Sequence, residues 1–214
     1  MTTLDYDLRS LDQDFESDLL ALDPEAQQLL FTEARTANAF TDEPVSDEQM
    51  RAVHDLVKWA PTAMNTQPLR VALVRSPEVR EQLVAAMSEG NRDKTRTAPL
   101  VAVLAADVDF HEEMDRTAPH ATAARDRFAS AEQAREDVAR TNALLQAAYF
   151  MIGVRAAGLA AGPMGGFDAD AVSRVAFPDG RHRAVLVVNI GHPAEGAFRP
   201  RQARLGFDEV VTVL

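Results

Sequence analysis

The sequence predicts a layered α/β fold, because segments with helical periodicity alternate along it with short apolar runs typical of strands. At 214 residues, with 46% hydrophobic and 26% charged residues, the chain has the length and balance of one globular domain with a sizeable core. The run "APLVAVLAAD" at 98–107 is apolar at nearly every position, as in a strand buried on both faces. The run "HRAVLVVNIGHP" at 182–193 is the clearest strand.

The first elements are predicted to be two helices. Asp23 and Pro24 form a good helix start, with Asp as the N-cap and Pro at the first helical position, and the helix is expected over 24–34. Ser46 and Gln49 complete a capping box that opens the second helix, which Pro61 ends. Its apolar face is expected to hold Met50, Val53, Leu56, Val57 and Ala60.

The middle of the chain continues the alternation. A strand is predicted at 69–75, a helix from Ser76 and Pro77 to Gly90, and the buried strand at 98–107. Residues 108–130 are irregular and charged, with helical character from about Ala121. A long helix follows over 133–157. Its part at 143–154 is apolar nearly all round, so we expect it to be buried on every side, within the monomer or between subunits.

The last third is predicted to hold a strand running into a glycine-rich turn at 159–167, a short helix at 168–177, the strand at 182–193 and an extended tail at 199–214. Residues 1–22 are acidic and rich in Leu without a firm period. We therefore predict an acidic N-terminal arm over 1–22 and a single domain over 23–214.

Composition excludes several classes of function. The net charge of −11 disfavours binding to nucleic acid, whose phosphates need a basic surface. The apolar runs are interrupted by polar residues, so we predict no membrane span. The acidic N-terminus lacks the pattern of a secretion signal, and the chain has no cysteine for disulfides, thiolate metal sites or nucleophilic catalysis. These features together predict a cytoplasmic protein.

Common catalytic motifs are also missing. The sequence contains neither a G-x-S-x-G nucleophile elbow nor a phosphate-binding P-loop, and no G-x-G-x-x-G follows a strand. The five histidines show no metal-ligand spacing. We therefore predict no metal site and assign no side chain as a catalytic acid, base or nucleophile.

Four loops remain that carry groups suited to an anionic, planar ligand. Arginine forks match phosphate oxygens, and glycine lets backbone approach a ligand closely. Taken singly, each loop has a structural explanation as a solvated arginine, a capped loop or a tight turn. The groups are Arg35, Thr36 and Asn38; Pro61, Thr62, Asn65 and Gln67; Pro163, Met164, Gly165 and Gly166; and Arg199, Arg201 and Arg204.

The same segments carry a resemblance. "ARTANAF", "APTAMNTQP", "GPMGGF", "NIGHP" and "RQARLGFDEVV" resemble, in this order, the motifs of the nitroreductase family of FMN-dependent oxidoreductases, from about residue 28 to the C-terminus. The resemblance implies a three-layer sandwich with a central mixed, mainly antiparallel sheet flanked by helices. It also implies an obligate homodimer with FMN at the subunit interface.

The resemblance further implies roles for the loop residues. Arg35 and Thr36 would hold the FMN phosphate from one side, with Arg204 and Arg201 on the other. Asn65 would hydrogen-bond the flavin ring edge or ribityl chain, and Pro61 and Thr62 would shape its loop. The Gly165–Gly166 backbone would lie near the flavin N5 and O4, and Lys94 near the flavin or the substrate mouth. The remaining expected cofactor contacts are Asn38, Gln67, Pro163 and Met164.

The implied chemistry is a ping-pong reaction, in which NADPH or NADH delivers hydride to flavin N5 and a small-molecule acceptor then takes it. Asn38 replaces an arginine found in many relatives, and Met164 and Gly165 stand where many have Glu. Both differences favour the branch that reduces malonic semialdehyde to 3-hydroxypropanoate. The alternatives are a broad nitroaromatic or quinone reductase and a non-catalytic flavin-binding protein.

Overall fold

The computed structural model describes residues 19–214, which divide into two compact units between Ala34 and Arg35. The first unit holds α2, Pro24–Gln27, followed by a π-helical turn η1, Gln28–Thr32. The side chain of Asp23 accepts the backbone N–H of Ala26 at 2.9 Å, which confirms the predicted helix start. Most of the predicted acidic arm lies outside the described residues, so the boundary between 22 and 23 stays a prediction.

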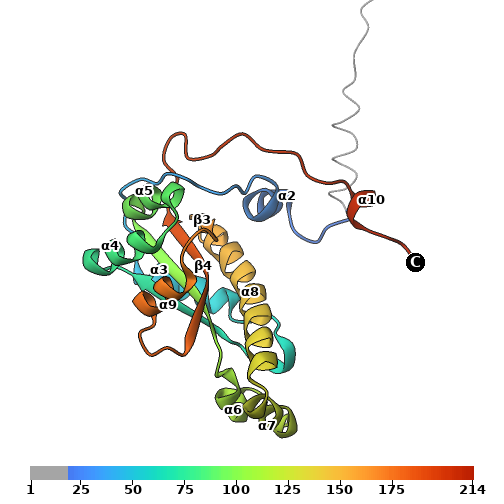
Figure 1. The fold of residues 1–214 in the computed structure, drawn as a ribbon. Coiled ribbons are helices and arrows are strands. Elements are labelled where there is room, and N and C mark those ends of the chain that lie inside the picture. Colours follow the sequence, from blue (N-terminus) through green and yellow to red (C-terminus); the bar gives the residue numbers. More distant parts are fainter. Residues whose placement is uncertain (1–18) are drawn as a thin grey trace, which may run out of the picture. The chain divides into compact units, whose positions relative to one another are not determined.

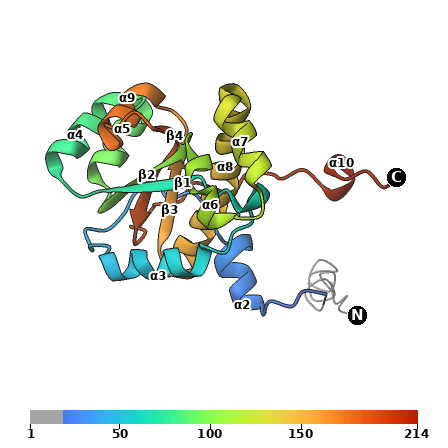
Figure 2. The ribbon, with the colours of Figure 1, turned by 90° about the horizontal axis from the view of Figure 1, so that it is seen from below.

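The second unit is built on a four-stranded sheet of order β1-β2-β4-β3, with every pairing antiparallel. Figure 1 shows the helices that flank this sheet, and Figure 2 labels its four strands. The register between β2 and β4 shifts at Leu104 and Ala105, where a bulge bends the sheet. This antiparallel sheet, flanked by helices, confirms the predicted fold class. The strands are β1, Leu69–Val74; β2, Leu100–Asp107; β3, Ala160–Met164; and β4, His182–Gly191.

Strand β2 lies at the centre and is buried along its whole length. Leu100, Ala102 and Leu104 belong to the hydrophobic cluster on one face of the sheet. Val101 and Val103, which alternate with them, belong to the cluster on the other face. The apolar run in the sequence is thus explained by burial on both faces, as expected.

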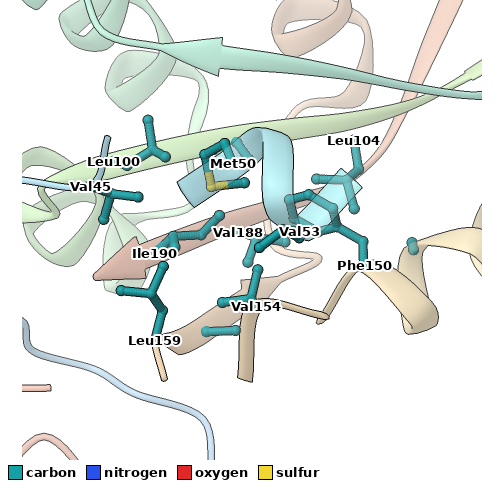
Figure 3. Packing of buried hydrophobic residues seen from close by; sticks show 13 residues of the cluster. Val45, Met50, Val53, Leu100, Leu104, Phe150, Val154, Leu159, Val188 and Ile190 are labelled. Atoms are coloured by element: carbon teal, nitrogen blue, oxygen red, sulfur yellow. The ribbon is translucent and has the colours of Figure 1, made fainter. Parts of the chain in front are cut away.

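Helices cover both faces of the sheet, which makes three layers. Met50 and Val53 of α3 and Phe150 and Val154 of α8 pack on one face, with Val188 of β4 beneath them (Figure 3). Figure 2 shows α4, α5 and α9 grouped on one side of the sheet and α3 on the other. These helices are α3, Asp47–Val57; α4, Pro77–Ala86; α5, Glu89–Thr97; α8, Glu132–Ala156; and α9, Ala169–Ala176.

Helix α3 begins as predicted and ends earlier. The Ser46 hydroxyl accepts the Gln49 N–H at 3.1 Å and the Gln49 side chain accepts the Ser46 N–H at 2.8 Å, so the capping box is present. The helix ends at Val57 rather than next to Pro61. Leu56, predicted on the same apolar face, is 59% exposed in the single chain. Only one side of this surface helix can reach the sheet, and Met50 and Val53 occupy it.

Helix α5 was not predicted. The sequence predicted one helix ending at Gly90, whereas α4 ends at Ala86 and a new helix, α5, runs through Gly90. Met87 interrupts the two because it is buried in extended conformation and forms an isolated β-bridge with Phe167. A tertiary contact therefore outweighs the local helical pattern.

The remaining short helices are η2, Ala63–Asn65; η3, Phe110–Glu113; α6, Met114–Thr117; α7, Thr122–Ser130; and α10, Phe207–Val210.

Helix α8 is buried on its sheet-facing side and partly exposed on the other. Leu145 and Tyr149, one helical turn apart, are 49% and 43% exposed. The all-round apolar segment is therefore not fully covered within one chain.

Within residues 19–214, every helix is too short or too polar to cross a bilayer.

Candidate functional site

Two segments that are distant in sequence lie side by side next to β3. The backbone N–H of Ala37 donates to Ala161 O at 3.1 Å, and that of Asn38 donates to Ala197 O at 2.9 Å. Ala37 also forms an antiparallel bridge with Phe198. A Cβ at Gly162 would lie 2.5 Å from Ala37 O, so only glycine allows this close approach. Beside β3, the segment around Ala37 thus lies next to the segment around Phe198, where the C-terminal tail begins.

Between these segments lies a cavity of about 330 Å³, which we call the cationic cavity. Five of its lining residues are Arg or Lys, and none of those described is acidic, although the chain as a whole carries a net charge of −11. Such a concentration of basic side chains in one lining fits an anionic ligand. The lining residues are Arg35, Thr36, Asn38, Lys94, Arg199, Pro200, Arg201, Gln202 and Arg204.

Arg35 is held by the tail. Its guanidinium carbon lies 5.1 Å from the centroid of the Phe198 ring, and its Nη1 donates to Arg199 O in a long 3.5 Å contact. Its Nε is buried and finds no acceptor among the described residues. A buried donor without an acceptor is costly. An oxyanion in the cavity would supply acceptors for this guanidinium.

Lys94 enters the cavity from α5. Its backbone O accepts the Nδ2 of Asn189 from β4 at 2.9 Å, which fixes the helix against the sheet. Burial lowers the pKa of Lys94 from its ordinary value of 10.5, and the neighbouring Arg199 lowers it further. An anion placed beside Lys94 would act in the opposite direction and raise this pKa, because it stabilises the charged amine.

The glycine-rich turn after β3 is held by α5. Gly166 O accepts the Nδ2 of Asn91 at 2.9 Å and the N–H of Ser88 at 3.0 Å. A Cβ at Gly166 would lie 2.8 Å from the Asn91 Nδ2, so this position has no room for a side chain. A Cβ at Gly165 would meet nothing within 4 Å. In this turn, the backbone at Gly165 is therefore open to a ligand, whereas the adjacent Gly166 is held by hydrogen bonds.

Met164 and Pro163 precede this turn in β3. The Met164 side chain is buried, and its sulfur lies 3.7 Å from the Thr95 hydroxyl in the core behind the turn. A ligand could therefore reach Met164 only through its backbone. Pro163 is half-buried.

The loop between α3 and β1 forms a separate polar cluster. Asn65 Nδ2 donates to Thr117 O of α6 at 2.8 Å, and Asn65 Oδ1 accepts the Nε2 of Gln67 at 2.9 Å. The N–H of Gln67 donates to the Thr62 hydroxyl at 3.2 Å. Pro61 is exposed at the start of the loop. None of these residues lines the cationic cavity.

The structure thus gathers in one cavity six of the residues for which the resemblance implied a cofactor or substrate contact, together with Arg199, named as a candidate in the tail. The other predicted residues lie in β3 and the turn after it, and in the loop between α3 and β1. Pro200 and Gln202 line the cavity without having been predicted, although they belong to the arginine-rich segment "RPRQAR". Asn91 was missed because the predicted helix end at Gly90 hid α5. The gathered residues are Arg35, Thr36, Asn38, Lys94, Arg201 and Arg204.

Comparison with known proteins agrees with the fold. The model of the nitroreductase family matches residues 32–192. A Streptomyces coelicolor protein named "Putative NADH dehydrogenase/NAD(P)H nitroreductase" is 60% identical over 195 residues, 91% of this chain and 99% of that protein.

Two solved structures share the architecture. A nitroreductase family protein from Streptococcus pneumoniae superposes with a TM-score of 0.76 at 23% identity, covering 89% of this chain and 98% of its own. A protein from Exiguobacterium sibiricum, solved in complex with FMN, gives a TM-score of 0.73 at 19% identity, covering 91% of this chain and 98% of its own. The family match and the relative at 60% identity lead to one conclusion: the chain belongs to the nitroreductase family.

Proposed function

We propose that this protein is an FMN-dependent oxidoreductase that takes electrons from NADPH or NADH. The observation that carries the proposal is the cationic cavity, with five basic residues and no acidic one among its described lining. A phosphate monoester carries a charge of about −1.5 to −2 at neutral pH and offers three strong acceptor oxygens. The relative named for NAD(P)H nitroreductase and the neighbour solved with FMN support the same assignment.

The residues of the chain would bind and orient this cofactor. Arg35 and Arg204 would pair with the phosphate, with Arg201 and Thr36 beside them. The open backbone at Gly165 leaves room for a ring to approach. Bound FMN would supply the hydride chemistry. An aldehyde acceptor would also need a proton on its alkoxide oxygen, and water or a ribityl hydroxyl of the flavin would supply it. Within residues 19–214, no group of three or more His, Asp or Glu side chains could hold a metal ion.

The acceptor that we propose is malonic semialdehyde or a similar small aldehyde. The support is the sequence resemblance, in which Asn38 stands at a position where many family members carry Arg; Asn38 lies in the cavity wall. Met164, the other difference noted in the sequence, has its side chain in the core and so does not bear on the choice. A nitroaromatic or quinone acceptor, and flavin binding without turnover, are the alternatives. A cytoplasmic location stays a prediction.

We also propose that the active form is a homodimer. The Thr62–Gln67 loop does not line the cationic cavity of its own chain. We propose that the loop of a second copy completes the FMN site. Apolar side chains left exposed are candidates for the surface between the copies. They are Leu56, Trp59, Leu145, Tyr149, Leu205, Phe207 and Val210.

The dimer proposal predicts the effect of a charge on α8. Leu145→Glu should shift the protein from dimer to monomer in analytical ultracentrifugation, because an unpaired carboxylate would be buried at an apolar interface. The matched control is Arg140→Glu, which places the same carboxylate at an exposed position on the same helix and should leave the dimer intact. A wild-type protein that sediments as a monomer would refute the proposal.

The test of the proposed function is the visible absorption of the purified protein during anaerobic titration. Flavin bands that bleach with NADPH or NADH and recover with malonic semialdehyde would support the aldehyde reductase. Recovery only with a nitroaromatic compound or a quinone would identify the broad reductase instead. Flavin bands that neither nicotinamide bleaches would indicate a flavin-binding protein. A protein that cannot take up FMN would refute the proposal.

Lys94 predicts how FMN affinity depends on pH. A phosphate dianion stabilises the charged amine, so Lys94 holds its proton more tightly in the complex than in the free protein. Above the second pKa of the phosphate, about 6, the affinity should therefore be constant as long as Lys94 is charged in both states. It should fall as the pH rises through the lowered pKa of Lys94 in the free protein, below its ordinary 10.5. Fluorescence titration with FMN measures this, and Lys94→Gln should bind more weakly without that decline.

A further inference from the structure

The loop between α3 and β1 has an unusual backbone. Met64, Asn65 and Gln67 have φ angles of 51°, 53° and 42°, in the left-handed region that residues with a Cβ rarely adopt. Three such residues within four positions are strained, and strained backbone persists only where the surrounding structure enforces it. Within the loop, the N–H groups of Asn65 and Thr66 donate to Thr62 O and Ala63 O, both at 3.1 Å. The side-chain bonds of Asn65 and Gln67 stay within the loop or reach the backbone of α6. Other groups must therefore fix the two ends of the loop.

Two buried amides of α8 fulfil that role. Asn142 Oδ1 accepts the N–H of Ala63 at 2.7 Å, at the beginning of the strained segment. Gln146 Oε1, one helical turn further along, accepts the N–H of Leu69 at 3.0 Å, directly after it. Both side chains are less than 10% exposed. The strained segment is thus held at both ends by one rigid helix.

These amides lie on the face of α8 that otherwise packs apolar residues. Ala143, Ala147 and Phe150 beside them belong to the hydrophobic clusters of the core. Burying a side-chain amide there is unfavourable unless its polar atoms are paired. Asn142 completes its pairing by donating Nδ2 to Val138 O at 2.8 Å. The cost of two polar groups in a core position is offset by the loop hydrogen bonds that they make.

We infer that Asn142 and Gln146 are positioning residues, which hold the Thr62–Gln67 loop in the conformation that receives FMN. The inference rests on the proposed function and extends it to two residues that the loop motifs do not include. A loop held in its bound shape before the ligand arrives loses less conformational entropy on binding. Without these anchors the left-handed residues would relax and Asn65 would leave its present position.

The experiment compares Asn142→Leu and Gln146→Leu with wild type. Each variant keeps a side chain of similar size and removes the acceptor of one loop N–H. The matched control is Ser173→Ala. Ser173 is also buried, and its hydroxyl accepts the N–H of Ala184 at 2.9 Å, far along the chain from the loop. The control therefore also removes an acceptor for one buried backbone N–H and leaves the loop anchors in place.

The readouts are amide hydrogen exchange of residues 61–69 in the FMN-free protein and the dissociation constant of FMN. We expect each α8 variant to speed exchange in this segment and to raise the dissociation constant about tenfold, the scale of one buried hydrogen bond. Ser173→Ala should lower the thermal stability about as much as each α8 variant does, because it also removes one buried hydrogen bond. It should change neither the exchange of residues 61–69 nor the dissociation constant of FMN.

Unchanged exchange of the loop, or FMN binding as tight as in wild type, would overturn the inference for that residue. An equal loss of FMN affinity in Ser173→Ala would also overturn it, because general destabilisation would then explain the effect. Failure of the wild-type protein itself to bind FMN would overturn the proposed function, and the inference with it. That outcome is distinguishable, since it appears before any substitution is made.

Discussion

Arg35→Ala and Arg204→Ala should each weaken FMN binding by about 10- to 100-fold, the scale of one charge-assisted hydrogen bond to a phosphate. Both guanidiniums line the cationic cavity, and the Nε of Arg35 finds no acceptor within the described chain. Within residues 19–214, the hydrogen bonds of Arg204 are local, to Gln202 O at 3.0 Å and Ala203 O at 3.2 Å. Its removal should therefore leave the free energy of unfolding nearly unchanged.

The measurement is the fraction of flavin retained on gel filtration, followed by fluorescence titration of the FMN-free protein. The control is Arg183→Ala, which removes an exposed arginine that donates to Gly180 O and does not line the cavity. Arg35→Lys should restore part of the affinity, because lysine keeps the charge and loses the planar fork. Full flavin occupancy in both alanine variants would refute the phosphate site.

Asp107→Ala should lower the free energy of unfolding by about 3 kcal/mol, which corresponds to about 6–12 °C in melting temperature for a chain of this size. Asp107 is 1% exposed at the end of β2. Its Oδ1 accepts the Nε of Arg181 at 2.6 Å, and its Oδ2 accepts the Nη2 of Arg70 at 2.8 Å. The Asp109 N–H also donates to Oδ1, at 2.9 Å. The substitution would leave these donors unpaired at the junction of three strands.

The pKa of Arg181 is raised above its ordinary value, chiefly by its hydrogen bonds to Asp107, in agreement with a strong pair. The matched control is Asp47→Ala. Asp47 pairs with Arg75 at 2.5 Å, but both side chains are largely exposed, and such pairs contribute about 0–1 kcal/mol. Both variants lose an ion pair, but only Asp107→Ala loses a buried one. Comparing their thermal unfolding therefore separates the contribution of burial from that of ion pairing. Equal losses would show that the environment of Asp107 adds nothing.

Local patterns predicted much of the fold. The capping box at Ser46 and the helix start at Asp23 depend on contacts within one turn, so the sequence contains the whole interaction. The apolar run of β2 required a strand buried on both faces, and the structure places it at the centre of the sheet. The break between α4 and α5 could not be predicted in this way. It depends on the bridge between Met87 and Phe167, which are distant in sequence.

The same distinction holds for the site. Arginines, glycines and amides in four loops identified the segments that carry it, because these residue types have few other uses in that combination. Which of them share a cavity depends on the crossing of Ala37 over Gly162, a contact that only the folded chain makes. Asn142 and Gln146 look like interior positions of an apolar helix in the sequence. Their role appears only where the helix meets a loop that precedes it by more than seventy residues.

The sequence by itself determined the order and type of most elements, the family and the chemical character of the candidate ligand. These follow from periodicity, capping and residue type, all of which act over a few residues. The tertiary structure alone decided that Lys94 joins Arg35 in the cationic cavity, that Met164 turns into the core, and that the Thr62–Gln67 loop does not line that cavity. Such facts depend on packing between distant segments, and no local pattern encodes the distance between them.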